Sequence, residues 1–276
     1  PHYQVARFVA PNFMAGNTII LKHAPQCPKT AEVIADMFKE VGVPEGVYNN
    51  IFATNEQAAT IIHDKRVQGI SLTGSERAGQ AVAKEAGGAL KKVVLELGGS
   101  DAFIVAADAD IKQAIKGAIS GRFGNAGQAC NAAKRLIVLE SVYDKFVEGF
   151  TDAVRGMTLA DPLDEKTFIG PMSSKAAAVN LQAQLDSAVE AGATVLVEGG
   201  LVKDKPGAWF KPAVLTDVTE SMDVYREELF GPVAVVYKAR DVDHAIKIAN
   251  DVPFGLGASI QTQDAALAAD IADKLE

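Results

Sequence analysis

The spacing of apolar residues predicts strands and helices that alternate along the N-terminal part of the chain. Short apolar runs predict buried strands, and apolar residues three or four positions apart predict helices with one buried face. The expected strands cover residues 17–22, 47–53, 69–72 and 93–97. The expected helices cover residues 30–41 and 57–63, with another beginning at Ser75. This alternation is typical of a parallel sheet with helices on both faces.

A second α/β pattern follows the glycine pair Gly98 and Gly99, which predicts a boundary between two domains, residues 1–97 and 98–276. The expected strands of the second domain cover residues 103–105, 135–139, 194–197, part of 230–237, and 257–261. The expected helices begin at Asp110 and cover 142–157, 174–191 and 242–250. Two layered α/β domains would leave a cleft between them, which is a natural place for a ligand.

Composition and charge narrow the classes of partner. The 276 residues are 48% hydrophobic and 22% charged, as in an ordinary globular protein. A net charge of -8 without a Lys/Arg cluster predicts no nucleic-acid or membrane partner. Two cysteines make no disulfide framework and favour a reducing, cytoplasmic setting. The four histidines lack metal-ligand spacing, so we expect no metal.

A strand that runs through Gly74 into a helix is the first candidate site. Glycine lets the backbone approach a phosphate closely, and Ser75 stands where the free N–H groups of a helix N-terminus favour an anion. The alternative is a simple N-cap, because the spacing of the common dinucleotide fingerprint is absent.

Three further segments carry reactive or binding groups. Glu96 ends an apolar run, where desolvation is expected to raise its pKa toward that of a general base, and the alternative is a capping or salt-bridged carboxylate. Cys130 lies among small residues that leave room for a substrate at a nucleophilic thiolate. A lone cysteine is more often an inert apolar residue, which is our interpretation of Cys27. Residues 227–233 offer carboxylates, an aromatic ring and a Gly-Pro turn, which suit a ribose and a flat ring.

Taken together, these segments resemble the aldehyde dehydrogenase superfamily over essentially the whole chain. The matching motifs are Glu-Leu-Gly-Gly at 96–99, Gly-Gln-x-Cys at 127–130 and Glu-Glu-x-Phe-Gly-Pro at 227–232. They stand in the family's order, and Cys130 follows Glu96 by the family's 34 residues. The resemblance implies a Rossmann-type cofactor domain and an α/β catalytic domain, each layered on a parallel sheet.

The resemblance also implies a role for each matching residue. Cys130 would be the nucleophile, with its backbone N–H as one oxyanion donor, and Glu96 would activate the water that hydrolyses the thioester. The implied cofactor is NAD or NADP. Its implied contacts are Lys22 at the adenosine ribose, Thr73, Gly74 and Ser75 at the pyrophosphate, the Leu97 carbonyl at the carboxamide, Glu228 at the nicotinamide ribose, and Phe230 beside it.

Within the superfamily, the segments 21–25 and 90–101 most resemble bacterial enzymes that oxidise succinate semialdehyde with NAD or NADP. A distal carboxylate calls for a cation, and Arg7 and Arg122 are the candidates, with a surface role as the alternative for each. Gly124 stands where animal-type relatives place a second arginine. Pro25 stands where NAD-dependent members carry a glutamate, so a 2′-phosphate should be tolerated.

The two ends lead us to expect a piece of a longer protein. The chain begins at Pro1, without a Met, and its last residues, 274–276, are interpreted as lying inside a helix. In the family, the second oxyanion donor is an asparagine that would lie just before Pro1. We expect a homodimer or homotetramer of the full-length protein. Two alternatives stay open, namely a dehydrogenase for a longer or uncharged aldehyde and a non-catalytic protein that retains the fold.

Overall fold

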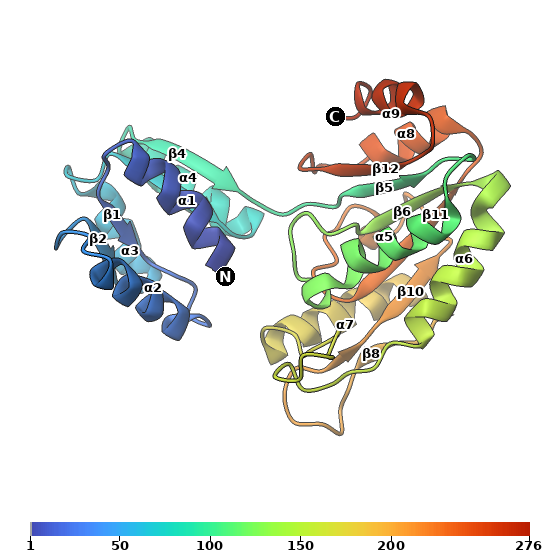
Figure 1. Ribbon diagram of the computed structural model, residues 1–276, viewed down its shortest axis with the longest axis horizontal. Helices are drawn as coiled ribbons and strands as arrows, with labels where there is room; N and C mark the ends of the chain where they lie inside the picture. The colour runs from blue at the N-terminus through green and yellow to red at the C-terminus, as the bar shows by residue number, and fades with distance from the viewer. Residues whose placement is uncertain (1) are drawn as a thin grey trace. The chain divides into compact units, whose positions relative to one another are not determined.

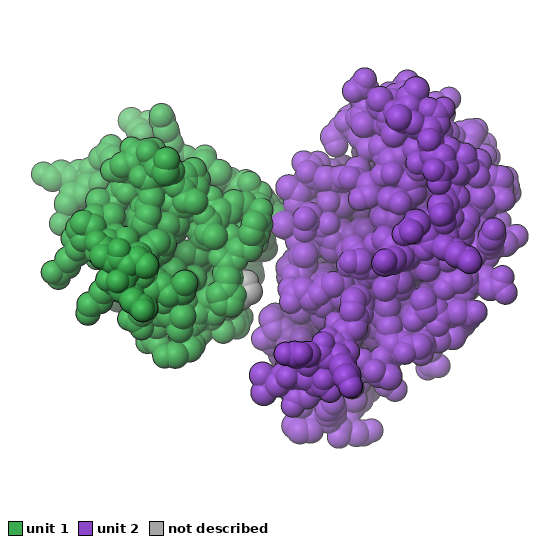
Figure 2. Space-filling view, in the orientation of Figure 1, with its two compact units in different colours: residues 1–97 green, residues 98–276 purple. Residues whose placement is uncertain are grey.

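The computed structural model describes residues 2–276, and the chain forms two compact units, residues 1–97 and 98–276 (Figure 2). Each unit mixes helices with mainly parallel strands. In the described part of the chain, no helix has the length and apolar character needed to cross a membrane.

The first unit contains two parallel strand pairs surrounded by helices (Figure 1). Its elements are α1 (His2–Met14), β1 (Ile19–Leu21), α2 (Pro28–Glu40), β2 (Tyr48–Asn50), α3 (Asn55–His63), β3 (Gly69–Thr73), α4 (Glu76–Gly88) and β4 (Lys92–Glu96). β1 pairs with β2, and β3 pairs with β4 in a register that places Thr73 beside Glu96. The rings of Phe13, Phe38 and Tyr48 pack together and join α1, α2 and β2.

The second unit is built on a six-stranded sheet with the order β12-β5-β6-β11-β10-β7. Its strands are β5 (Ala102–Val105), β6 (Arg135–Leu139), β7 (Thr194–Val197), β10 (Ala213–Thr216), β11 (Val233–Ala239) and β12 (Ala258–Gln261). A separate antiparallel pair is formed by β8 (Gly200–Leu201) and β9 (Phe210–Lys211). All neighbours in the large sheet are parallel except β7, which runs antiparallel to β10 at the edge.

Helices cover both faces of this sheet (Figure 1). One face packs against α5 (Ile111–Phe123) and α6 (Glu140–Arg155), whose buried residues share a core with Leu136 and Val138 of β6. The other face packs against α7 (Lys175–Glu190), α8 (Val242–Asn250) and α9 (Ala265–Ala272). Alternate residues of β6 therefore enter opposite cores, as the two-residue period of a strand requires.

Several elements differ from the sequence-based expectations. We did not predict α1, which carries Pro11 in its interior, where proline normally interrupts a helix. The antiparallel edge strand β7 departs from a purely parallel sheet, which is a common variation in α/β folds. The last helix ends at Ala272, so residues 273–276 lie outside it, contrary to our interpretation of the C-terminal segment.

Candidate active site

Cys130 lies on a constrained loop between α5 and β6. Asn125, Ala126 and Gly127 all have positive φ angles, of 54°, 54° and 71°. This conformation is uncommon for residues with a side chain and must be held by its surroundings. The Asn125 side chain donates to the Gln128 carbonyl at 3.1 Å, and the Gln128 side chain donates back to the Asn125 carbonyl at 3.2 Å. The loop thus presents a half-buried, free Cys130 thiol from a fixed backbone.

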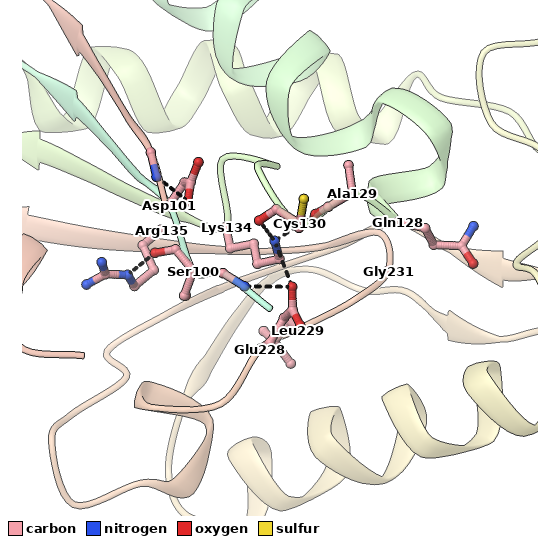
Figure 3. Close-up of polar contacts among 12 residues, drawn as sticks. Ser100, Asp101, Gln128, Ala129, Cys130, Lys134, Arg135, Glu228, Leu229 and Gly231 are labelled. Atoms are coloured by element: carbon pink, nitrogen blue, oxygen red, sulfur yellow. Dashed lines mark hydrogen bonds and ion pairs between the residues drawn. The ribbon is translucent and has the colours of Figure 1, made fainter. Parts of the chain in front are cut away.

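The glycine pair after β4 passes directly against this loop. A Cβ atom on Gly99 would lie 2.6 Å from the Cys130 carbonyl oxygen, and one on Gly98 would lie 2.6 Å from Glu228 Oε2. The Gly99 N–H donates to Glu228 Oε1 at 3.2 Å. Gly99 is therefore required by its close approach to backbone, Gly98 leaves room for the Glu228 carboxylate, and Cys130 and Glu228 lie close together at this pair (Figure 3).

A buried lysine, which we did not predict, lies between Cys130 and Glu228 (Figure 3). Lys134 Nζ donates to the carbonyls of Ala129 and Cys130, each at 2.8 Å, and lies 3.2 Å from Glu228 Oε1. Its side chain is 1% exposed, and burial lowers its pKa. A pair of cations, Lys134 and Arg135, where the buried strand β6 begins was the signal in the sequence.

The segment that carries Glu228 and Phe230 is held by hydrogen bonds from Arg122. Arg122 is fully buried, and its guanidinium donates to the carbonyls of Val233 and Leu229, each at 2.8 Å, and to that of Gly231. Burial lowers the Arg122 pKa to about 9. This geometry corrects the prediction that Arg122 binds a substrate carboxylate, because Nε and Nη2 meet backbone carbonyls, Nη1 is buried without a hydrogen-bond partner among the described residues, and the side chain does not reach the surface. Phe230, in contrast, is 42% exposed and open to a ligand.

In the first unit, Arg7 forms an ion pair with Glu96. The Arg7 and Glu96 side chains lie 3.4 Å apart, and each is 35% exposed. Glu96 is therefore partly buried, as expected, but it is accompanied by a cation. Arg7 also donates to the side chain of Gln4 at 3.3 Å. The predicted substrate cation and the predicted base thus touch one another within the unit.

The predicted phosphate site lies where β3 ends, beside the end of β4, which carries Glu96. The Gly74 N–H donates to the Glu96 carbonyl at 3.0 Å, so the turn after β3 is fixed beside the end of β4. Ser75 is the N-cap of α4, and its hydroxyl accepts the Ala78 N–H. Leu97 packs against Gly79, where a Cβ atom would lie 2.6 Å from the leucine side chain. Helix α4 consequently begins next to the 96–97 segment.

Two other predicted residues, Lys22 and Cys27, belong to the first unit. Lys22 directly follows β1 and is half-buried. Cys27 precedes α2 and is a free thiol with no capping hydrogen bond from its side chain. Within residues 2–276, no group of three His, Cys, Asp or Glu side chains is arranged to hold a metal ion.

Comparison with known proteins gives the family. The model of the aldehyde dehydrogenase family matches residues 1–276. A succinate-semialdehyde dehydrogenase [NADP(+)] of Deinococcus radiodurans is 49% identical over the whole chain, which covers 58% of that relative. The succinate semialdehyde dehydrogenase [NAD(P)+] Sad of Escherichia coli is 44% identical over the whole chain, which covers 60% of it. The chain therefore belongs to the aldehyde dehydrogenase family.

Solved structures agree with this assignment. The crystal structure of a succinic semialdehyde dehydrogenase from Streptococcus pyogenes, in complex with NADP+, has a TM-score of 0.96 and 41% identity. It matches 99% of this chain, which covers 60% of that one. The α/β architecture predicted from the sequence is thereby confirmed as the aldehyde dehydrogenase fold, and the chain spans about three fifths of the length of these relatives.

Proposed function

We propose that the protein containing this chain oxidises succinate semialdehyde to succinate with NADP+ or NAD+. The observation that carries the proposal is the loop of Cys130, which Gly99, Lys134 and Glu228 hold in one cluster. The family match and the names of the relatives at 44–49% identity support the same reaction. In this proposal, residues 1–97 belong to the cofactor domain and residues 98–276 form the catalytic domain.

Cys130 would act as the nucleophile. Its thiolate adds to the aldehyde carbon, forming a C–S bond and turning the carbonyl oxygen into an oxyanion. The Cys130 N–H, which has no backbone acceptor among the described residues, is free to donate to that oxyanion. The carbon then loses its hydrogen with the bonding electron pair, and the C=O bond re-forms as a thioester. Bound NAD(P)+ supplies the acceptor for that hydride.

Glu96 would complete the reaction as the general base. It removes a proton from water, the resulting hydroxide adds to the thioester carbon, and the C–S bond breaks to release the acid and the Cys130 thiolate. Its neighbour Arg7 forms an ion pair with it at 3.4 Å. Arg7 is also the remaining candidate for the distal carboxylate of the substrate, since it is a third exposed and Arg122 is enclosed.

The chemistry of the donor set fits a dinucleotide with a 2′-phosphate. Lys22 would contact the adenosine ribose, and no carboxylate occurs in residues 22–25 to repel the phosphate. The N–H groups at the start of α4, with Thr73, Gly74 and Ser75, suit the pyrophosphate. The Leu97 carbonyl would accept from the carboxamide, Glu228 would hold the nicotinamide ribose, and the exposed ring of Phe230 would pack beside it.

A substrate comparison tests this proposal. The protein containing this chain is assayed with succinate semialdehyde and with pentanal, an uncharged aldehyde of similar size, and the reduced cofactor is followed by absorbance. We expect a higher kcat/KM for succinate semialdehyde. Higher turnover of pentanal would reassign the substrate to uncharged aldehydes, and no turnover of any aldehyde would favour a non-catalytic protein of this fold. A homodimer or homotetramer is part of the proposal and is checked by analytical ultracentrifugation.

A further inference from the structure

We propose that Lys134 is a positioning residue that fixes the Cys130 loop and the Glu228 carboxylate to each other, and so couples the nucleophile to the cofactor site. The inference rests on the proposed function, because it gives that site one further residue. Lys134 lies in the middle of the cluster of Figure 3, between the two segments that it would couple.

The N–H donors of Lys134 are matched in number by the acceptors around it. An ammonium has three N–H donors, and Lys134 has three acceptors, namely the carbonyls of Ala129 and Cys130 and Glu228 Oε1. At 1% exposure, no water can replace an acceptor that moves away. Displacing either segment would leave a charged donor buried without a partner, which is costly. The ammonium therefore fixes the separation between the two segments.

Lys134 engages one carboxylate oxygen of Glu228 and leaves the other without a partner in the described part of the chain. Glu228 Oε1 is engaged by Lys134 and by the Gly99 N–H, whereas Oε2 has no hydrogen-bond partner within residues 2–276. The lysine thus holds one oxygen and leaves the other for a hydroxyl group of a ligand. Lys134 Nζ also lies 6.0 Å from the centre of the Phe230 ring, so it contacts a second residue of the proposed nicotinamide site.

The neighbouring cation Arg135 does not join a carboxylate to the cysteine loop as Lys134 does. Arg135 is also buried, but its guanidinium donates to the carbonyls of Ser100, Ile248 and Ala249, away from the cysteine. Lys134 is the cation that joins a carboxylate to the cysteine loop. The other charged groups that act on Lys134 are Arg122 of α5 and Asp101, which precedes β5.

A coupling through Lys134 has a measurable consequence for the thiol. Its charge lies 2.8 Å from the carbonyl oxygen of Cys130, and Glu228 partly cancels that charge, so a change at either residue alters the electrostatic environment of the cysteine. Neutralising Glu228 should speed alkylation of Cys130, and removing Lys134 should slow it. A group that only filled space would not link a change at residue 228 to the reactivity of residue 130.

The test is a double-mutant cycle on the rate at which iodoacetamide alkylates Cys130, without aldehyde or cofactor. All variants carry Cys27→Ser, so that Cys130 is the only thiol among these 276 residues, its alkylation is followed in its own peptide by mass spectrometry, and serine is favoured at that N-cap. We expect Glu228→Gln to raise the rate about 3- to 10-fold at neutral pH, and Lys134→Met to lower it by a similar factor. In the Lys134→Met background, Glu228→Gln should change the rate less than 2-fold. Asp186→Asn, whose carboxylate accepts from Gln182 on α7, is the matched control and should leave the rate unchanged.

A second readout follows the cofactor site. Calorimetry should show at least 10-fold weaker NADP+ binding for Lys134→Met, and Lys134→Arg should retain affinity closer to the parent. If Lys134→Met does not give a cooperative thermal transition, that variant is not folded. The coupling is then tested by Glu228→Gln alone, because the proposal requires Glu228→Gln to change the rate of Cys130 alkylation. An unchanged alkylation rate in Glu228→Gln, or the same change with and without Lys134, would overturn the proposal. Neither result depends on turnover, so a wrong substrate would not be mistaken for a failed coupling.

Discussion

Gly99 lies so close to Cys130 that a methyl group on its α-carbon would come within 2.6 Å of the cysteine carbonyl oxygen. The same glycine donates its N–H to Glu228, so its backbone is held from the other side. The cysteine carbonyl is backbone, so it cannot rotate away as the end of a flexible side chain can. The Cys130 loop is thus shaped by a residue that itself has no side chain.

Replacement of this glycine should damage the site more than the fold. We expect Gly99→Ala to displace the Cys130 loop and lower kcat/KM by about 100-fold or more, as misplacement by about 1 Å can do. Gly87→Ala is the matched control, because a Cβ atom at Gly87 of α4 meets no atom within 4 Å. The control should keep its activity, and equal activity in both variants would contradict the close approach.

Arg122 should affect stability and not substrate choice. Arg122→Met removes the guanidinium donor from the carbonyls of Leu229, Gly231 and Val233, of which the first two keep a backbone N–H donor. We expect a loss of about 3–5 kcal/mol in the free energy of unfolding, measured by urea denaturation. Lys274→Ala, which removes an exposed ion pair with Asp270, should cost about 0.5 kcal/mol or less. A changed preference between charged and uncharged aldehydes with unchanged stability would restore Arg122 to the substrate site.

Arg7 should separate substrate recognition from support of the base. We expect Arg7→Gln to lower kcat/KM for succinate semialdehyde by about 10-fold or more, and that for pentanal by less, because only the former has a carboxylate to bind. Some loss with pentanal is expected, since Arg7 lies 3.4 Å from Glu96. Equal losses with both aldehydes would show that Arg7 acts only through Glu96.

Asp101 should make stability depend on pH. Burial raises its pKa from the ordinary value of 3.8 to about 6, although Lys134 and the Gly257 N–H oppose the shift. The folded protein therefore holds this proton where the unfolded chain has released it, so the contribution of Asp101 to stability falls as pH rises from about 4 to about 6 and stays lost above that.

Asp101→Asn removes this titration. Thermal melting of both proteins across that range should show the variant gaining relative stability as pH rises, because the amide resembles the protonated acid. A constant difference in melting temperature between the two proteins would contradict the raised pKa.

The sequence predicted much of this structure because its strands are marked by local patterns. The apolar run of β6 was predicted at its observed bounds, Arg135–Leu139, as was α8, Val242–Asn250. Helix α1 was missed because Pro11 interrupts the usual signal. The antiparallel direction of β7 depends on its partner β10, which no local pattern encodes.

The site was predictable only where a motif carries the chemistry. Cys130, Glu96 and Glu228 stand in motifs, so their types and order were informative. Lys134 and Arg122 are different, since a lysine or arginine in a sequence is normally interpreted as a surface residue, and only the structure shows its acceptors. Those acceptors are backbone carbonyls and a carboxylate that lies 94 residues beyond Lys134 in the chain.

The most direct test of the account is to trap the thioester. In Glu96→Gln, hydrolysis should slow while hydride loss continues, so mixing with succinate semialdehyde and NADP+ should give one rapid equivalent of reduced cofactor. Peptide mass spectrometry should then locate a succinyl group on Cys130, and Cys130→Ala should give neither the burst nor the adduct. Reduced cofactor formed by Cys130→Ala, or a burst in Glu96→Gln without an adduct on Cys130, would contradict the account.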